Sequence, residues 1–263
     1  MSKLAVEQYF DESDELYRQL WNPDGSKHWG YFIDVEKAST FEDFLRASDY
    51  WTECLLERSK LSQDSEVLEI GSANGVVSTM LAQQTGATVI GIDISETHVQ
   101  QAINNLKGTP NLKLSFQKAS ATSLPFENNS FTHVWSQSTF SHIADNNSVL
   151  SEAFRVLKPG GLLIFDDVIV PNKSTSVLTQ ELFFDRLFIP LKLTAQEYKD
   201  AIMQAGFDII ESEELSEHMK KCYEIQAERT RDINLHRSEI NQQHFDAISN
   251  KEIGWHYFLC KKV

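Results

Sequence analysis

The chain has 263 residues, of which 41% are hydrophobic and 24% are charged, which is ordinary for a globular domain that buries a sizeable core. Its formal net charge of −14 disfavours nucleic acid as a partner, because an acidic surface repels phosphate backbones. No apolar run approaches the roughly 18 residues of a membrane span, and the first residues lack the apolar core of a signal peptide, so we expect a single cytoplasmic domain.

The first 60 residues are expected to form two helices that cover the rest of the domain. The first, over about residues 3 to 20, ends at the dense turn signal Asn22-Pro23-Asp24-Gly25, and the second spans residues 40 to 59. Aromatic residues crowd this segment, and most such residues serve as core packing. Ring faces could also cover a bound ligand and stabilise a cation. The candidates for such a lid are Tyr9, Trp29 and Tyr31.

The strongest signal is a pair of apolar runs at residues 66–70 and 88–93, each ending in a small polar or acidic turn. Strands buried on both faces of a parallel sheet have this pattern. Gly71 and Gly75 follow the first run and let the backbone approach a ligand closely, where the free amides of a helix favour an anionic group. Asp93 ends the second run, where a carboxylate can accept bonds from both hydroxyls of a ribose. The pattern predicts a nucleoside-bearing cofactor.

The details of the glycine turn decide between cofactors. The dinucleotide fingerprint Gly-x-Gly-x-x-Gly is not met, because its second and third glycines are replaced by Ala73 and Val76, which disfavours a nicotinamide oxidoreductase. The acid Glu69 before the turn completes Acid-x-Gly-x-(Gly/Ala)-x-Gly, which resembles motif I of the class I methyltransferases that use S-adenosylmethionine. Two buried strands joined by a purely structural turn remain the alternative. The contacts that the resemblance implies for this cofactor, and for its product S-adenosylhomocysteine, are Glu69, Gly71, Ser72, Ala73, Gly75, Asp93 and Ile94.

The resemblance continues over most of residues 9 to 210. Leu124-Pro125-Phe126, the run 130–136 and Arg155-Val156-Leu157-Lys158-Pro159-Gly160-Gly161 follow in the order and at the spacings of that family. The segment with Leu20-Trp21-Asn22-Pro23 and His28-Trp29-Gly30-Tyr31-Phe32 is similar to small-molecule methyltransferases of the tocopherol, sarcosine/dimethylglycine, phosphoethanolamine and natural-product type.

An α/β fold follows from alternating strands and helices. We expect a Rossmann-like, doubly wound, mostly parallel seven-stranded sheet with an N-terminal helical lid and a helical cap inserted after strand five. One domain would span residues 1–263, with the lid at 1–60, the cofactor-binding core at 61–170, and cap helices and last strands at 171–263. The expected strands are 66–70, 88–93, 112–117, 131–136, 161–167, 207–213 and 255–261. Thr194 and Glu197 form a capping box for the helix before the sixth strand.

Further cofactor contacts come from the resemblance, with one departure. The family usually has an acidic residue four positions before the Leu124-Pro125-Phe126 loop, where it binds the adenine amino group, and this chain has Ser120 there. A serine hydroxyl accepts such a bond more weakly than a carboxylate. The remaining contacts expected are Ala121, through its backbone amide, together with Ser136 and Gln137 at the end of the fourth strand.

The chemistry implied is direct displacement of a methyl group from a sulfonium by an oxygen, nitrogen or carbon nucleophile, which needs positioning and often a base. His142 follows the fourth strand and Asp167 ends the fifth, so both are candidate catalytic residues beside the methyl group. The "His-x-x-Asp" loop after strand four and the acid ending strand five supply bases in some natural-product O-methyltransferases. His142 could instead cap a loop. Asp166 and Asp167 could be metal ligands, as in catechol-type enzymes, but no further motif supports this and we expect no metal.

The acceptor is expected to be a small molecule with a hydrophobic body, such as a specialised metabolite. An apolar cluster at helical spacing follows strand five, and it either packs in the core or lines an acceptor pocket. The acceptor-pocket candidates within it are Phe183, Leu187 and Phe188. Cys54, Cys222 and Cys260 form no zinc-binding pattern. The alternative to methyl transfer is a protein of the same fold that binds or cyclises a metabolite without methylating it.

Overall fold

The structure is a computed structural model that describes residues 15, 17–109 and 111–263. Most of the first expected helix, including Tyr9, lies outside the described residues. The helical elements are α2 (Phe41–Ser59), α3 (Val76–Thr85), α4 (Glu96–Asn105), η1 (Leu106–Gly108), η2 (Phe140–His142), α5 (Asn146–Val156), α6 (Val177–Thr179), η3 (Gln180–Asp185), α7 (Ala195–Gln204), α8 (Ser216–Thr230) and α9 (Leu235–Ser249). The strands are β1 (Glu66–Ile70), β2 (Thr88–Asp93), β3 (Leu114–Lys118), β4 (Phe131–Gln137), β5 (Leu157–Ile169), β6 (Phe207–Glu214) and β7 (Gly254–Lys262).

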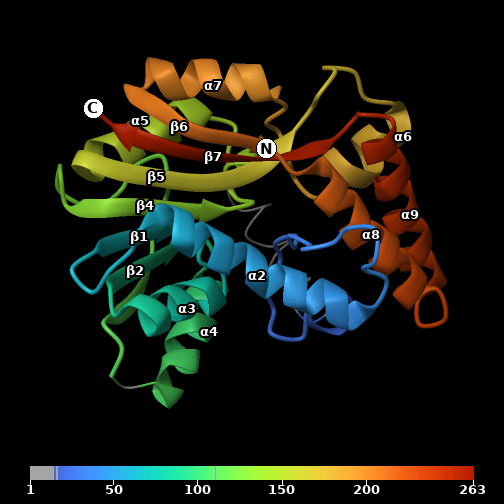
Figure 1. Ribbon diagram of the computed structural model, residues 1–263, viewed down its shortest axis with the longest axis horizontal. Coiled ribbons are helices and arrows are strands. Elements are labelled where there is room, and N and C mark those ends of the chain that lie inside the picture. The colour runs from blue at the N-terminus through green and yellow to red at the C-terminus, as the bar shows by residue number, and fades with distance from the viewer. Residues whose placement is uncertain (1–14, 16, 110) are drawn as a thin grey trace.

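The seven strands form one sheet in the order β3-β2-β1-β4-β5-β7-β6. The first five are parallel, whereas β7 runs antiparallel between β5 and β6. This is the expected Rossmann-like, mostly parallel seven-stranded fold, and the prediction is confirmed. Figure 1 shows α6, α8 and α9 gathered at one end of the sheet, the end toward which β4 points. Ligands of open α/β sheets bind at this carboxyl end of the parallel strands.

Hydrophobic side chains alternate between the two faces of the central strands. Val67 and Val89 pack with α2 and α3 on one face, whereas Leu68 and Val134 pack with α5 and α7 on the other. Both faces are therefore covered, which explains why these strands are nearly continuous apolar runs. The β5 strand begins earlier than expected because Leu157 already pairs with Phe131 of β4. Residues 158–161 then bulge out of register, and Gly160 takes a left-handed φ of +77° there.

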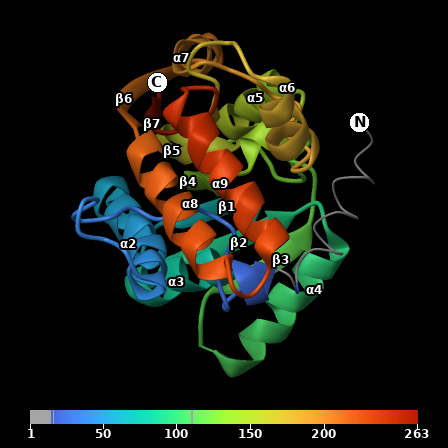
Figure 2. The same cartoon turned by 90° about the vertical axis from the view of Figure 1, so that its right-hand side faces the viewer.

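A helical cap follows β5 as expected and contains α6 and the π-helical turn η3, before α7 leads into β6. The α8–α9 hairpin between β6 and β7 forms a second and longer part of the cap. Figure 2 shows α8 and α9 side by side across that end of the molecule. None of the described helices combines the length and hydrophobicity needed to cross a membrane.

The segment before α2 is built into the same hydrophobic core as the strands. Trp21 and Trp29 are buried and belong to the cluster that contains Val67. Gly30 N donates to Cys222 Sγ at 3.3 Å, and Gln226 Nε2 on α8 donates to Trp21 O at 3.1 Å. This segment therefore lies against α8 as a fixed wall.

Candidate active site

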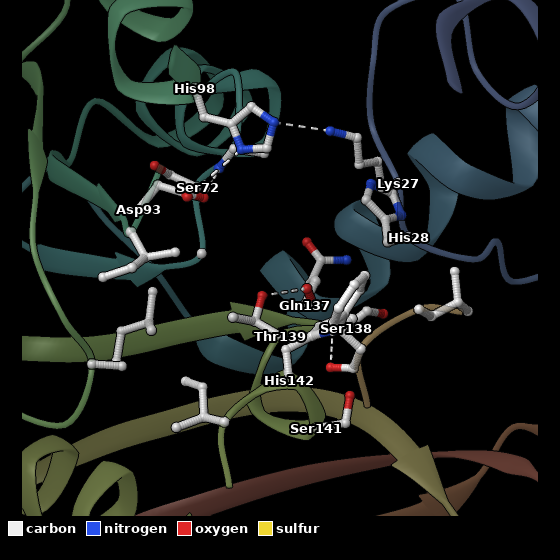
Figure 3. A pocket seen from close by; sticks show the side chains of 18 of the residues that line it. Lys27, His28, Ser72, Asp93, His98, Gln137, Ser138, Thr139, Ser141 and His142 are labelled. Carbon is white, nitrogen blue, oxygen red and sulfur yellow. Dashed lines mark hydrogen bonds and ion pairs between the residues drawn. The ribbon is translucent and has the colours of Figure 1, made fainter. Parts of the chain in front are cut away.

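A cavity of about 440 Å³ lies beyond the carboxyl ends of β1, β2 and β4. In Figure 3, Asp93 and His98 lie on one side of the cavity, and Gln137, Thr139 and His142 on the other. The sequence-predicted site residues that line it are Glu69, Gly71, Ser72, Ala73, Asp93, Ile94, Ser120, Ala121, Gln137, His142, Trp29, Leu187 and Phe188. Those described but outside its lining are Gly75, Ser136, Tyr31, Asp167 and Phe183.

The glycine turn brings the backbone to the cavity. Gly71 has a φ of +81°, and a Cβ there would lie 2.2 Å from Thr139 Oγ1, so only glycine fits. The backbone amides of Gly71 and Ser72 both donate to Ile92 O, at 2.8 and 2.9 Å, which ties the turn to β2. Ser72 Oγ is buried at the cavity with no hydrogen-bond partner among the described residues. It is thus available to a ligand.

Gly75 shapes this turn without touching the cavity. It adopts a φ of +84° at the start of α3, and a Cβ would meet the ring of Phe116 at 2.5 Å. Gly75 thus fixes the backbone of the turn, and its contact with the cofactor stays a prediction.

Asp93 is a charged acceptor at the end of β2. Its Oδ2 accepts from Ala73 N and its Oδ1 from Ser95 N, both at 2.9 Å, and His98 Nδ1 lies 3.6 Å from Oδ1. Burial opposes ionisation, but the bonds from His98 and the backbone outweigh it and hold the pKa of Asp93 below its usual value. Lys27 Nζ in turn lies 3.0 Å from His98 Nε2, so the segment before α2 contacts the residues around Asp93 (Figure 3).

Glu69 lies deeper, beneath the glycine turn. It is 3% exposed, and Ser78 on α3 donates a hydrogen bond to it. Burial raises the pKa of Glu69 to about 8. A cationic group of a ligand in the cavity would favour its ionised form.

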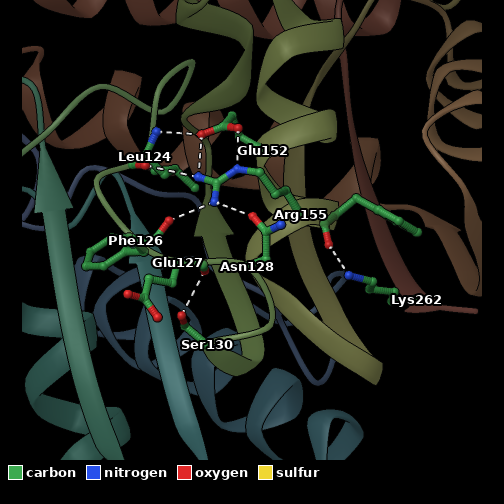
Figure 4. A network of polar contacts seen from close by, with 9 residues as sticks. Leu124, Phe126, Glu127, Asn128, Ser130, Glu152, Arg155 and Lys262 are labelled. Atoms are coloured by element: carbon green, nitrogen blue, oxygen red, sulfur yellow. Dashed lines mark hydrogen bonds and ion pairs between the residues drawn. The ribbon is translucent and has the colours of Figure 1, made fainter.

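The loop after β3 carries Ser120 and Ala121 to the cavity wall. Its far end is held by Arg155, which donates to Phe126 O at 2.7 Å and to Leu124 O at 3.0 Å (Figure 4). Glu152 accepts from Leu124 N at 2.6 Å and from the Arg155 guanidinium. Two motifs that resemble the methyltransferase pattern thus contact each other, and their role here is to fix the loop.

Ser136 and Gln137 at the end of β4 have different roles. Ser136 Oγ donates to Ile70 O at 2.9 Å and ties β4 to β1, so its predicted contact with the cofactor is not supported. Gln137 Oε1 accepts from Trp135 Nε1 at 3.1 Å, whereas its Nε2 is buried with no partner in the described chain. Gln137 therefore offers amide donors to a ligand.

His142 ends the turn η2 and lines the cavity. Its Nδ1 lies 3.2 Å from Phe188 O, an acceptor that keeps the proton on Nδ1 and makes Nε2 the basic nitrogen. Phe188 has a φ of +53°, a left-handed conformation that is strained for an aromatic residue and that turns its carbonyl to this position. Burial lowers the pKa of His142, so the ring is neutral at neutral pH.

Asp167 does not fit the role of a base. It is fully buried outside the cavity and accepts from Ser141 N at 2.6 Å, Val168 N at 2.8 Å and Tyr198 Oη at 3.0 Å. Burial raises its pKa to about 7. Since Ser141 precedes His142, Asp167 is a positioning residue that holds the loop bearing the imidazole.

Asp166 is likewise structural. It accepts from the indole Nε1 of Trp51 and of Trp255, both at 2.8 Å, and from Ser138 Oγ at 3.0 Å. These donors join α2, β7 and the loop after β4. Among the residues that the structure describes, no group of three or more His, Cys, Asp or Glu side chains could hold a metal ion.

Of the aromatic residues proposed for the lid, those that the structure describes only partly face the cavity. Trp29 lines the cavity, but Tyr31 stacks on Trp51 at 5.5 Å and on His218 at 3.9 Å between ring centroids, so it packs elsewhere. Tyr17 and Trp21 line the cavity instead. Both are among the aromatic residues concentrated in this segment, and nothing in the sequence favours them over the other aromatic residues there.

The cap contributes Leu187 and Phe188, whereas Phe183 packs against Phe184 at 5.3 Å and His244 at 5.1 Å between ring centroids. Phe183 is therefore packed in the core in this structure, and its contact with the acceptor is not supported by its position. Cavity residues that the sequence analysis did not assign include Arg186, Tyr223 and Arg237. Residues 223 and 237 come from α8 and α9, whose placement no motif indicated.

Comparison with known proteins identifies similar chains. A family model described as "Methyltransferase domain" matches residues 68–165. Methyltransferase GfsG of Streptomyces halstedii is 30% identical over 218 residues, which cover 82% of this chain and 77% of that protein. (+)-O-Methylkolavelool synthase of Herpetosiphon aurantiacus is 28% identical over 218 residues, covering 82% and 75%. The crystal structure of the cyclase SpnF matches with a TM-score of 0.80 and 20% identity, over 100% of this chain and 97% of that one, a likeness of fold.

Proposed function

We propose a function on the premise that this chain belongs to the S-adenosylmethionine-dependent methyltransferases, as its similarity to methyltransferase GfsG over most of both chains indicates. The enzyme transfers a methyl group from S-adenosylmethionine to a small-molecule acceptor. The observation that carries the assignment is one cavity that joins the carboxylate of Asp93, the glycine turn at Gly71 and the imidazole of His142. A carboxylate suited to the ribose of the cofactor and an imidazole suited to remove a proton thus line the same cavity.

The residues present fit the cofactor along the β1–β2 side of the cavity. Asp93, ionised and facing the cavity, would accept from the ribose hydroxyls. Ser120 and the amide of Ala121 would meet the adenine, on the loop that Arg155 fixes. Buried Glu69 and the Ser72 hydroxyl, which has no hydrogen-bond partner among the described residues, suit the amino acid end of the cofactor, whose ammonium and carboxylate need partners.

Bound there, S-adenosylmethionine would supply a methyl group that its sulfonium activates toward a nucleophile. The chain contributes mainly position and exclusion of water, and holding reactants in place can provide about 7 to 11 kcal/mol of the barrier reduction. Trp21 and Trp29 are buried against the cavity and shield it. Their ring faces also tolerate a cation.

His142 is proposed as the general base. Its Nδ1 proton is held by Phe188 O at 3.2 Å, so Nε2 can accept a proton from an O–H or N–H nucleophile. The lowered pKa keeps the ring neutral and ready to accept at neutral pH. A base of this kind accounts for about 10² to 10⁴ in rate.

The acceptor is proposed to have a hydrophobic body. The cavity wall beside His142 is formed by apolar side chains from the cap and the β4 and β5 ends. They are Ile143, Val168, Leu187, Phe188 and Ile189. Such a wall favours a specialised metabolite over a bare small amine, and with a net charge of −14 we do not expect a nucleic-acid acceptor.

Transfer of label from methyl-labelled S-adenosylmethionine to a panel of amines, phenols and prenyl-like or polycyclic metabolites tests the function. We expect labelled products from apolar acceptors, and far less product with His142→Ala. Turnover of small polar amines alone would contradict the hydrophobic body. Tight cofactor binding without any labelled product would favour the non-methylating alternative.

A further inference from the structure

Two arginines line the cavity of this acidic protein, and the function proposed above uses neither. Arg186 follows η3 in the cap, directly before Leu187, and Arg237 lies in the first turns of α9. Both come from elements after β5, whereas the glycine turn and Asp93 come from β1 and β2. The two guanidiniums therefore belong to the cap side of the cavity, where the acceptor is expected.

Arg237 is buried, and no carboxylate among the described residues pairs with it. The residue is 8% exposed, its Nε has no hydrogen-bond partner among the described residues, and its guanidinium lies 5.7 Å from the ring centroid of Tyr17. Arg186 donates from Nε to Leu182 O at 3.1 Å. Neither guanidinium forms an ion pair with a carboxylate in the part of the chain that the structure describes.

The positive charges of Arg186 and Arg237 both act on the imidazole of His244. His244, on α9, lies with Nε2 3.1 Å from Leu182 O, the carbonyl that Arg186 also contacts. Burial, and then the positive charges of Arg186 and Arg237, lower the pKa of His244 to about 3. The electrostatic potential around the two guanidiniums is thus positive, and His244 stays neutral and carries no charge of its own.

A buried cation that no carboxylate neutralises is unfavourable, and a planar guanidinium fork matches the two oxygens of a carboxylate or phosphate. We propose that Arg237, together with Arg186, forms an anion subsite that binds a carboxylate or phosphate on the acceptor. This inference rests on the proposed function and narrows it. The acceptor is an amphipathic anion whose apolar body lies along Leu187 and whose nucleophile reaches His142.

Calorimetry on protein saturated with S-adenosylhomocysteine tests the subsite with three matched probes: 4-phenylbutyrate, 3-phenylpropyl phosphate and methyl 4-phenylbutyrate. We expect at least one anion to bind about ten-fold more tightly than the neutral ester, as charge-assisted hydrogen bonds imply. Whichever anion binds more tightly identifies the group as carboxylate or phosphate. Arg237→Gln and Arg186→Gln should each reduce the preference, and Arg237→Lys should retain part of it.

Arg231→Gln is the matched control, because Arg231 is exposed and pairs with Glu228 at 2.9 Å on the surface. It makes the same change in net charge and should leave the preference intact. S-adenosylhomocysteine affinity, measured first for every variant, reports that the protein is folded. Equal binding of ester and anions to the wild type, or no binding of any probe, would overturn the subsite. Loss of S-adenosylhomocysteine binding in Arg237→Gln would also overturn it, since the arginine would then bind the cofactor's carboxylate. If the wild type itself fails to bind S-adenosylhomocysteine, the proposed function falls instead.

Discussion

Replacing Asp93 with asparagine tests the nucleoside site with the smallest change in shape. The carboxylate has two oxygens, and each already accepts a backbone amide, from Ala73 and from Ser95, at 2.9 Å. In the variant an NH₂ group must face one of these N–H donors, and the charge that the ribose hydroxyls would meet is lost. Hydrogen bonds to a charged group contribute about 1.5 to 3 kcal/mol, so S-adenosylhomocysteine should bind roughly 10- to 150-fold more weakly.

Titration calorimetry with S-adenosylhomocysteine measures this change, and thermal unfolding measures any loss of stability. Asp208→Asn on the exposed side of β6 is a matched control that makes the same change in charge. It should bind like the wild type. Unchanged affinity in Asp93→Asn, with a lower unfolding temperature, would refute the reasoning, because the carboxylate would then serve only to clamp the glycine turn.

Four further predictions concern the proposed base His142, the glycine turn at Gly71, and the buried pair of Asp167 and Tyr198. His142→Ala should lower turnover by about 10² to 10⁴ and leave S-adenosylhomocysteine affinity intact. Because burial lowers the pKa of His142 from its ordinary value of 6.5, the activity of the wild type should persist as the pH falls to 6.5 and decline only below it. Gly71→Ala should abolish cofactor binding and lower the unfolding temperature, because its Cβ would lie 2.2 Å from Thr139 Oγ1. In the wild type, the pKa of Asp167 is raised from 3.8 to about 7, so the stability that this group contributes should fall as the pH rises from 3.8 to 7. Chemical denaturation across this pH range should show that Asp167→Asn lacks this pH dependence of the free energy of unfolding. Tyr198→Phe should reduce the free energy of unfolding by about 0.5 to 1.5 kcal/mol through the lost bond to Asp167.

A clear result would contradict each of the first three predictions. A His142→Ala enzyme that retains most of its turnover would make His142 a loop residue. Normal binding by Gly71→Ala would mean that the turn can shift away from Thr139. Identical pH dependence of unfolding in the wild type and Asp167→Asn would show that Asp167 has an ordinary pKa in the folded state.

The sheet and the glycine turn were predictable because their signals are local. Runs such as 66–70 and 88–93 are apolar since both of their faces are covered, and Gly71 directly follows the first run with a left-handed φ of +81° that favours glycine. Asp93 was identified for the same reason, at a fixed place after the turn. These features stand out in the sequence itself, although Thr139, which also excludes a Cβ at Gly71, comes from a distant loop.

The predicted site residues that lie outside the cavity depend on distant partners instead. Asp167 seemed catalytic because it ends a strand, but Tyr198, which binds it, comes from a helix 31 residues later. Tyr31 seemed part of a lid, but the stacking partner His218 comes from α8. The buried face of α9 contains Arg237, Asn241 and His244, so no apolar stripe revealed that this helix covers the cavity.

A crystal structure of the protein with S-adenosylhomocysteine tests the central claim most directly, namely that this cavity holds the cofactor opposite the base. The account predicts ribose hydroxyls on the carboxylate of Asp93, adenine at the amide of Ala121, and the sulfur facing the side of the cavity that bears His142. A nucleoside bound elsewhere, or with its sulfur directed away from His142, would contradict it.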